Sequence, residues 1–220
     1  MVEKSSESIG LEAHPLLSAL SKASRAKLID NAIVHGVAGG TVLFEQGDMP
    51  NFQHVVIAGS VHLFGRSVDG REVLIEVVEA PDLVIPAAVV TGSPYLMQAR
   101  VAEPSRFLLI HATAFRAAVA HDPKLACEVI GSLAGQFRRM VRQIKNLKLR
   151  SSTQRVGCYI LALSKRQGTP DRAVLPYEKN LIASELGITR ESFSRALATL
   201  QNFGIAVRSE ERRVGKECRL

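Results

Sequence analysis

The chain has 220 residues, of which 46% are hydrophobic, so it can bury the core of one medium domain and of a smaller second one. It contains no apolar run of about eighteen residues that could span a membrane, and its N-terminal segment lacks the apolar stretch of a secretory signal. Three widely spaced cysteines, Cys127, Cys158 and Cys218, argue against a disulfide framework and for a cytoplasmic protein. We expect Cys127 and Cys158 to be small buried side chains of helices.

Charge is distributed unevenly along the chain. Residues 1–137 carry 10 Lys or Arg and 14 Asp or Glu, whereas residues 138–220 carry 18 Lys or Arg and 7 Asp or Glu. A strongly basic second half joined to a mildly acidic first half indicates that one part of the molecule meets a polyanion. Charge alone does not distinguish a nucleic acid from an anionic membrane surface.

The first half of the chain changes from a helical to a β pattern. Residues 11–35 are expected to be helical, because Leu16, Leu20 and Leu28 fall on a rough helical repeat. From Gly36 onward, short runs rich in β-branched and aromatic residues alternate with turn signals. These expected strands are Thr41–Phe44, Val55–Ile57, Val61–Phe64, Glu72–Val78 and Arg106–Ile110.

Turns that contain glycine connect these runs. We expect Ala58-Gly59-Ser60 to join two strands in a hairpin, and Asp69-Gly70, the strongest hairpin dipeptide of the chain, to precede another strand. Glu45-Gln46-Gly47-Asp48 is a further turn signal. Short strands at this spacing predict a small antiparallel barrel or jelly roll, and with the helical second half they predict the α+β class.

A long helix is expected after Asp122-Pro123, and it spans about seven turns. A near-heptad apolar stripe of this length favours the seam of a parallel two-chain coiled coil. The alternative is a helix that lies on the core of its own domain. A further helix is expected from about Thr153, with Ser151-Ser152 as its N-cap. The stripe consists of Leu125, Val129, Leu133, Phe137, Met140, Ile144 and Leu147.

Two helices joined by a glycine turn are expected near the carboxyl end. Lys179–Leu186 forms the first helix, and Gly187 provides the turn. Thr189 is the N-cap of the second helix, which runs from Arg190 to about Asn202. This is the pattern of a helix-turn-helix, whose second helix enters the major groove of DNA. We expect the inward face of that helix to consist of Phe193, Leu197, Leu200 and Phe203.

The outward face of the second helix suits the major groove. Arg190, Glu191, Ser194 and Arg195 are spaced so that they are neighbours on one face of the helix. Arginine pairs with guanine O6 and N7, glutamate accepts from cytosine N4, and serine can contact several bases. The alternative is a solvated face on which Glu191 and Arg195 form an ion pair. The turn, the N-cap, the inward stripe and the basic charge together favour DNA.

Two motifs identify a family. Gly40-x4-Glu45-x-Gly47-Asp48, with Gly59-Ser60-Val61 downstream, resembles the β-roll of cyclic-nucleotide-binding-like domains. Ile188–Arg195 resembles a recognition helix. Over about residues 11–207 the chain thereby resembles the CRP/FNR family of bacterial transcription regulators.

The resemblance implies a transcriptional regulator, an activator or a repressor, that binds double-stranded DNA as a homodimer, responds to a small effector and works with RNA polymerase. Because catalytic motifs are absent from the sequence, we do not expect an enzyme. Its implied parts are a sensory β-roll over residues 1–122, a dimerisation helix over 123–150 and a winged helix-turn-helix over 151–220. The implied DNA-binding residues are Thr189, Arg190, Glu191, Ser192, Ser194 and Arg195.

The recognition motif resembles two kinds of operator reader. Glu191-x-x-Ser194-Arg195 resembles the FNR-type reader of TTGAT…ATCAA sites, whereas Arg190-Glu191-x-x-x-Arg195 resembles the CRP-type reader of TGTGA sites. We expect a TTGAT-like half-site. In a palindrome the two half-sites then lie about one helical turn apart.

Two well-known effectors of the family do not match the sequence. Cyclic-AMP binders carry Gly-Glu-Leu followed by an Arg-Ser or Arg-Thr pair. Val84–Ala87 and Tyr95–Met97 offer neither the carboxylate nor the arginine that holds the phosphate. An iron–sulfur cluster normally needs four thiolates, and no cysteine precedes Cys127. We therefore expect neither cyclic AMP nor an iron–sulfur cluster.

The apolar segment 84–97 and Leu147–Leu163 instead resemble the DNR/NnrR-type branch, whose members respond to nitric oxide through bound haem. This resemblance implies haem as the cofactor and His14 as the candidate axial ligand. The alternative for His14 is an exposed side chain near the terminus.

No catalytic pattern occurs: the sequence has no Walker-type loop, H-E-x-x-H, paired C-x-x-C or G-x-S-x-G motif. His54 and His62 flank one expected hairpin and are a candidate metal pair, as in a cupin-like enzyme. Solvated strand faces explain them better, and we expect no metal. The alternative function is a ligand-binding or protein-interaction module whose basic face meets an acidic partner or an anionic membrane.

The end of the chain departs from the family pattern. After Val207 the family forms a hairpin wing with alternating apolar residues, whereas residues 208–220 contain the mixed charge block Glu210–Arg213. We interpret residues 208–220 as a non-native tail. Without that tail, residues 138–207 still hold 13 Lys or Arg against 4 Asp or Glu, so the charge argument remains.

Overall fold

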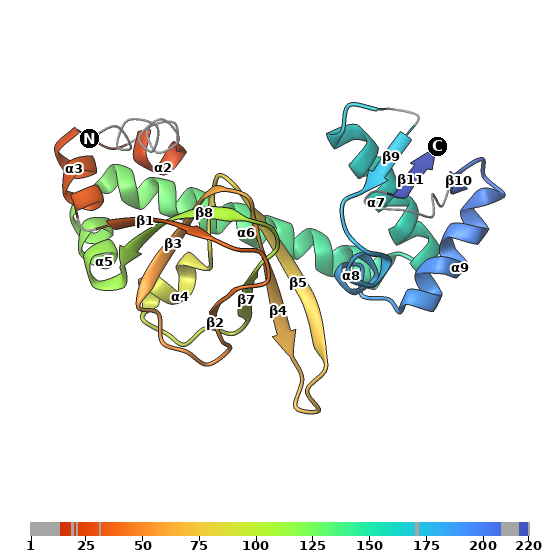
Figure 1. The fold of residues 1–220 in the computed structure, drawn as a ribbon, viewed down its shortest axis with the longest axis horizontal. Helices are drawn as coiled ribbons and strands as arrows, with labels where there is room; N and C mark the ends of the chain where they lie inside the picture. The colour runs from red at the N-terminus through yellow and green to blue at the C-terminus, as the bar shows by residue number, and fades with distance from the viewer. Residues whose placement is uncertain are drawn as a thin grey trace. The chain divides into compact units, whose positions relative to one another are not determined.

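The computed structural model of the chain describes residues 14–18, 20, 22–30, 32–169, 172–207 and 216–219 (Figure 1). The chain forms two compact units, Met1–Arg138 and Arg139–Leu220. Within the described ranges, no helix has both the length and the apolar composition that crossing a bilayer requires.

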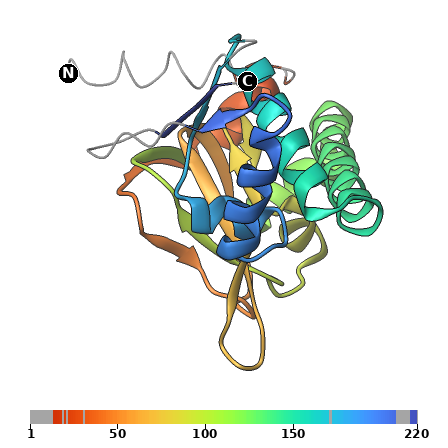
Figure 2. The same ribbon diagram turned by 90° about the vertical axis from the view of Figure 1, so that its right-hand side faces the viewer.

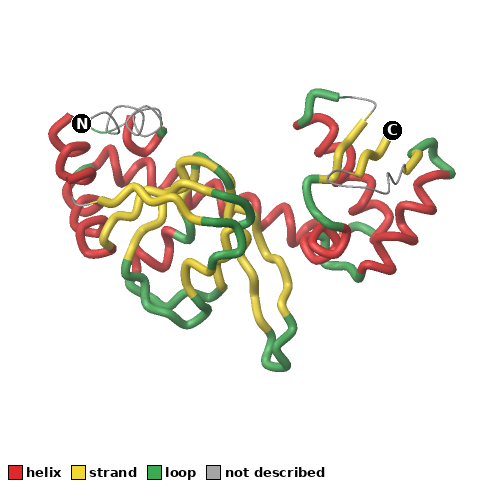
Figure 3. Tube along the Cα trace, in the orientation of Figure 1, coloured by secondary structure: helices red, strands yellow, loops and turns green. Residues whose placement is uncertain are grey.

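The first unit is a β-roll made of two four-stranded antiparallel sheets, with strand orders β1-β8-β3-β6 and β2-β7-β4-β5. Figure 3 shows these strands gathered in one group, beside the helices of the same unit. The bounds are β1 Ala32–Val37, β2 Val42–Phe44, β3 Phe52–Ala58, β4 Ser60–Arg66, β5 Glu72–Glu79, β6 Asp82–Leu83, β7 Gln98–Val101 and β8 Ser105–His111.

Apolar side chains fill the space between the two sheets. Val56 and Phe107 of the first sheet are buried in one core with Leu63 of the second. Successive side chains of a strand point to opposite faces, so Val55 and Leu108 lie on the other face of the first sheet. Helices cover that face and complete a second core. They are α2 (Pro15–Ser18), α3 (Lys22–Asp30), α4 (Pro86–Thr91), α5 (Ala112–His121) and the first turns of α6 (Pro123–Leu149).

The prediction of a helical segment over residues 11–35 is wrong at its end. α2 and α3 are helical, but Ala32–Val37 forms β1, which pairs with β8 from Ala32 opposite Ile110 to Val37 opposite Ser105. Pairing with a neighbouring strand overrides the weak local repeat, because strand formation depends strongly on tertiary context. Residues 11–13, 19, 21 and 31 lie outside the described residues.

The hairpin expected around Gly59 is also wrong. β3 pairs with β6 and β8, whereas β4 pairs with β5 and β7, so the chain crosses from one sheet to the other at Gly59. Gly59 has φ +85°, and a Cβ there would overlap the side chain of Ser105. The hairpin expected at Asp69-Gly70 is confirmed, because it joins β4 to β5 and extends from the roll in Figure 2.

Helix α6 is 27 residues long, and its apolar stripe divides into two parts. Leu125 and Val129 are buried in the core of the first unit, as the alternative interpretation of the stripe expected. Phe137 and Ile144 are exposed. Cys127 is exposed too, so the expectation of a buried side chain is wrong for it, while Cys158 of α7 (Ser152–Arg166) is half-buried.

The second unit packs three helices and a three-stranded sheet around one core. Ser151 caps α7 through a reciprocal pair of hydrogen bonds: its Oγ accepts from Gln154 N at 3.3 Å, and Gln154 Oε1 accepts from Ser151 N at 2.9 Å. The remaining elements are β9 (Arg172–Leu175), α8 (Lys179–Glu185), α9 (Arg190–Gln201), β10 (Ala206–Val207) and β11 (Lys216–Arg219), with strand order β10-β11-β9.

The segment interpreted as a tail contributes to this sheet. Residues 208–215 lie outside the described residues. β11 pairs with β10 and with β9, with Glu217 opposite Val174. Part of residues 208–220 therefore takes a regular place in the fold, and their non-native origin stays a prediction.

Candidate nucleic-acid interface and effector pocket

The turn between α8 and α9 requires glycine at position 187. Gly187 has φ +62°, in the left-handed region that glycine adopts without steric cost. A Cβ at this position would lie 2.6 Å from Leu147 Cδ2. Both the backbone conformation and the available space therefore exclude a side chain.

Arg155 of α7 holds the same turn in place. Its Nη1 donates to the carbonyl oxygens of Leu186 at 2.6 Å and Gly187 at 3.3 Å. The last carbonyls of a helix have no partner within the helix, and a guanidinium at this position satisfies them. Arg155 was not among the predicted site residues, because no local pattern links it to a turn 31 residues away.

Helix α9 is amphipathic and begins at the predicted cap. Thr189 Oγ1 accepts a hydrogen bond from Ser192 N at 3.2 Å, as expected of an N-cap. Phe203 is 77% exposed, which corrects its place in the inward stripe. Because α9 ends at Gln201, Phe203 lies in the following turn and leaves the helical repeat. The buried face consists of Phe193, Ala196, Leu197 and Leu200.

The opposite face of α9 presents the predicted polar residues. Arg190, Glu191, Ser194 and Arg195 are exposed, and Ser192 is half-buried beneath them. Arg195 Nη2 donates to Ser192 Oγ at 3.3 Å, and Ser192 Oγ accepts from the hydroxyl of the N-cap Thr189. The first turn of the helix therefore orients the guanidinium. Five of the six predicted contact residues thus lie within the first two turns of α9, and the sixth, Thr189, is its N-cap.

The ion pair that the alternative interpretation required does not form. In the described part of the chain, ion pairs join Arg66 and Arg100 to Glu72, and none joins Glu191 to Arg195. The backbone N–H of Glu191 and the Thr189 hydroxyl hold the pKa of the Glu191 carboxyl below its usual value. Glu191 is therefore an ionised acceptor at neutral pH.

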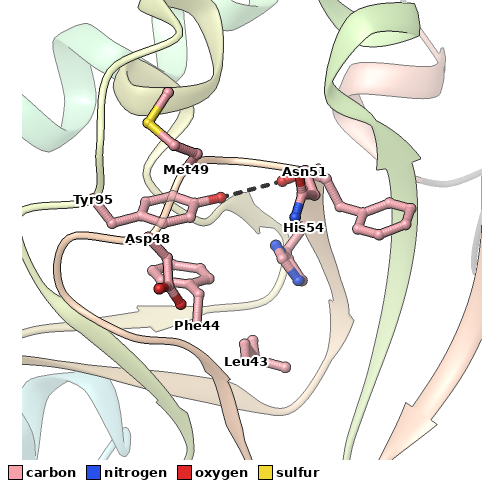
Figure 4. A pocket seen from close by; sticks show the side chains of 8 residues that line it. Leu43, Phe44, Asp48, Met49, Asn51, His54 and Tyr95 are labelled. Atoms are coloured by element: carbon pink, nitrogen blue, oxygen red, sulfur yellow. Dashed lines mark hydrogen bonds between the residues drawn. The ribbon is translucent and has the colours of Figure 1, made fainter.

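The first unit contains a cavity of about 480 Å³. Its inner end consists of the buried rings of Phe44, His54 and Tyr95, and its mouth includes the exposed Asp48 and Met49 (Figure 4). The rings of Phe44 and Tyr95 are stacked, with centroids 3.6 Å apart. The lining also includes Leu43, Asn51 and Phe52.

The two titratable side chains at the inner end are uncharged at neutral pH. Burial lowers the pKa of His54 to about 4. Burial, and after it the charge of Asp48, raises the pKa of Tyr95 to about 12. His54 Nδ1 is enclosed and has no hydrogen-bond partner among the described residues. The Tyr95 hydroxyl donates to the Phe52 carbonyl oxygen at 3.3 Å.

His54 and His62 lie in surroundings that differ from the predicted ones. Both are buried, which corrects the expectation of solvated strand faces, and they belong to strands of different sheets. Among the described residues, no group of three or more potential ligands could hold a metal ion.

His14 is 5% exposed, which corrects the alternative of an exposed side chain near the terminus. Its Nδ1 accepts from Leu16 N at 3.2 Å, and its Nε2 is enclosed without a partner among the described residues. Burial lowers the pKa of His14, against the opposing charge of Asp82. His14 does not line the cavity.

Comparison with known proteins matches both units. A cyclic nucleotide-binding domain matches residues 35–122, and a Crp-like helix-turn-helix domain matches residues 154–215. The chain is 25% identical over 169 residues to a CRP-like cAMP-activated global transcriptional regulator of Mycobacterium tuberculosis, and the match covers 75% of each protein.

Two solved structures share the fold. The c-di-GMP-responsive global regulator CLP of Xanthomonas campestris has a TM-score of 0.74 at 19% identity, covering 89% of this chain and 98% of CLP. DNR from Pseudomonas aeruginosa has a TM-score of 0.51 at 23% identity, covering 100% of this chain and 96% of DNR. At these identities the likeness concerns the fold.

The molecule is of the class in which an antiparallel jelly roll and a long helix precede a DNA-binding helix-turn-helix. The predicted α+β fold class is thereby confirmed. The chain thus carries the two domains of CRP/FNR-type DNA-binding transcriptional regulators, which are regulators rather than enzymes. Of the polyanions that the basic second half allows, the match to a Crp-like helix-turn-helix domain supports DNA.

Proposed function

We propose that the protein binds a palindromic promoter site as a homodimer, and that a small effector held by the β-roll controls this binding. The exposed face of α9 is the observation that carries the proposal. Its two guanidinium groups, from Arg190 and Arg195, lie on the side opposite the buried Phe193 and form no ion pair within the described residues. They are available for base edges, with Glu191 beside them as an acceptor for cytosine N4.

The exposed part of α6 supports the homodimer. Ile130, Phe137, Val141 and Ile144 follow one another at steps of seven, four and three residues, as in a heptad, and all four are exposed. Ile130 and Phe137 are 63% and 64% exposed, which is a large apolar surface for one helix. A parallel second copy of α6 would cover these side chains and would place two recognition helices on two half-sites.

The half-site we propose is TTGAT-like, because Glu191, Ser194 and Arg195 share the exposed face of α9. The test is the fluorescence anisotropy of three labelled duplexes: an inverted repeat of TTGAT, an inverted repeat of TGTGA, and a scrambled sequence. We expect the first to bind most tightly. Tightest binding of the second would replace the proposed operator, and equal binding of all three would refute sequence reading by α9.

Arg195→Ala is expected to reduce the preference for the repeat over the scrambled duplex by about 10-fold to 100-fold, since a good bidentate pair contributes about 1–3 kcal/mol of discrimination. Arg166→Ala is the matched control, because Arg166 is an exposed arginine of α7 outside the recognition helix. It should leave the preference unchanged. A preference that persists in Arg195→Ala would contradict the assignment.

Haem does not fit the described site, although the DNR/NnrR resemblance implies haem and nitric oxide. An axial ligand needs a nitrogen that the iron can reach, whereas Nε2 of His14 is enclosed by the protein. The cavity of the β-roll is lined by other residues, so this nitrogen and the cavity do not meet. We expect no visible absorption band in protein purified from haem-supplemented cells. A haem band that is lost in His14→Ala would establish haem as the effector group instead.

A further inference from the structure

The cavity of the β-roll has the size of a small-molecule site, with an apolar inner end and a polar mouth. Its volume of about 480 Å³ lies within the range of about 300–1,000 Å³ that is typical of ligand pockets. The buried rings of Phe44 and Tyr95 form its inner end, and Asp48 and Asn51 are exposed at its mouth. Such a cavity takes the apolar part of a ligand inside and leaves a polar part near solvent.

The charges around the cavity disfavour an anion. Among the described residues, no lysine or arginine lines it, and Asp48 is the one charged lining residue. Asp48 Oδ2 accepts from Glu45 N at 2.8 Å, so the carboxylate is fixed at the mouth. A phosphate or a carboxylate placed there would meet a like charge and no cation. A cyclic nucleotide therefore suits this cavity poorly.

His54 supplies the inner end with one group that can orient a ligand. It is 8% exposed and lines the cavity, and its enclosed Nδ1 has no partner among the described residues. In Figure 4 its ring lies close to Phe44 and Leu43, below Tyr95. A neutral imidazole offers one donor and one acceptor nitrogen. Because Nδ1 is enclosed, we infer that a ligand would meet Nε2.

We propose that this cavity binds an uncharged, planar aromatic molecule that carries one hydrogen-bonding group for His54. The aromatic lining of Phe44, Phe52 and Tyr95, the Asp48 carboxylate at the mouth and the unpartnered imidazole select this class. Ligand binding can be measured on the chain alone. Only the further expectation, that a bound ligand changes the affinity for DNA, rests on the proposed function.

Three probes separate the contributions: quinoline, which has a ring nitrogen; naphthalene, which has no polar group; and 2-naphthoate, which is an anion. The chain contains no tryptophan, so probe fluorescence is measured without interference from that residue. The methyl resonance of Met49 at the mouth reports the location of binding. We expect quinoline and naphthalene to bind and to shift this resonance, and 2-naphthoate to bind at least tenfold more weakly than naphthalene.

His54→Phe keeps an aromatic ring and removes the nitrogens. We expect it to weaken quinoline about tenfold, which is about 1.4 kcal/mol, and to change naphthalene affinity by less than about twofold. His35→Phe is the matched control, because His35 is an exposed histidine of β1 that does not line the cavity. It should change neither probe. Equal weakening of both probes by His54→Phe, or of neither, would overturn the role of His54.

Asp48→Asn tests the charge argument independently and remains informative if His54→Phe does not fold. It should bring 2-naphthoate to within about threefold of naphthalene, because it removes the like charge. Failure of both uncharged probes to shift the Met49 resonance would overturn the site itself. If quinoline binds but saturation leaves the affinity for the TTGAT repeat unchanged, the cavity is a ligand site without the proposed control of DNA binding.

Discussion

Replacing His54 by phenylalanine will remove part of the acid sensitivity of folding. The pKa of His54 is about 4 in the folded chain because of burial, against an ordinary value of 6.5. Between about pH 6.5 and pH 4 the unfolded chain therefore binds a proton that the folded chain does not, and stability is lost as the pH falls. One pKa unit corresponds to about 1.36 kcal/mol, so His54 accounts for a loss of about 3 kcal/mol over this window.

The free energy of unfolding of the wild type, of His54→Phe and of the control His35→Phe is measured in urea at several pH values between about 7 and about 4. The free-energy difference between His54→Phe and the wild type should grow by about 3 kcal/mol as the pH falls. Contributions from carboxylates, and from the buried His14 and His62, are common to these proteins and cancel. Parallel curves for His54→Phe and the wild type would refute the reasoning.

Three further substitutions test the second unit and α6. Gly187→Ala should lower the thermal unfolding midpoint of the second unit, because φ +62° disfavours a side chain and the new Cβ meets Leu147. Adding Leu147→Ala to this variant should recover only the part of the loss that is due to the clash. Ser151→Ala removes the reciprocal cap of α7 and should cost about 1 kcal/mol in urea unfolding, and an unchanged midpoint would contradict the cap. Ile144→Glu should convert a dimer to a monomer in sedimentation equilibrium, whereas Lys145→Glu, on the neighbouring exposed position, should leave the dimer intact.

Features whose determinants are close in sequence could be predicted from the chain alone. The Ser151 and Thr189 caps, the Gly187 turn and the Asp69-Gly70 hairpin each depend on a few adjacent residues. The exposed face of α9 follows from the helical period in the same way. The polar face of the candidate DNA interface was therefore predicted correctly as a surface, while its contacts with bases stay a prediction.

Features that depend on distant partners could not be predicted. Ala32–Val37 is a strand because β8 lies beside it, and the crossing at Gly59 depends on which strands pair in each sheet. The cavity combines residues between 43 and 54 with Tyr95, which share no periodic signal. The one local signal for His54 was its place beside the apolar run Val55–Ile57, where a polar residue becomes buried with the strand.

The division of α6 into a buried and an exposed face has a consequence for the diversification of such regulators. Leu125 and Val129 are buried in the core of the β-roll, whereas Ile130, Phe137 and Ile144 are exposed. In the proposed homodimer, mutations of the second set would change which chain pairs with which, without disturbing the first. On this proposal, a few substitutions on the exposed face of α6 would keep paralogues in one cell from forming mixed dimers, and the proposed ligand sites would stay unchanged.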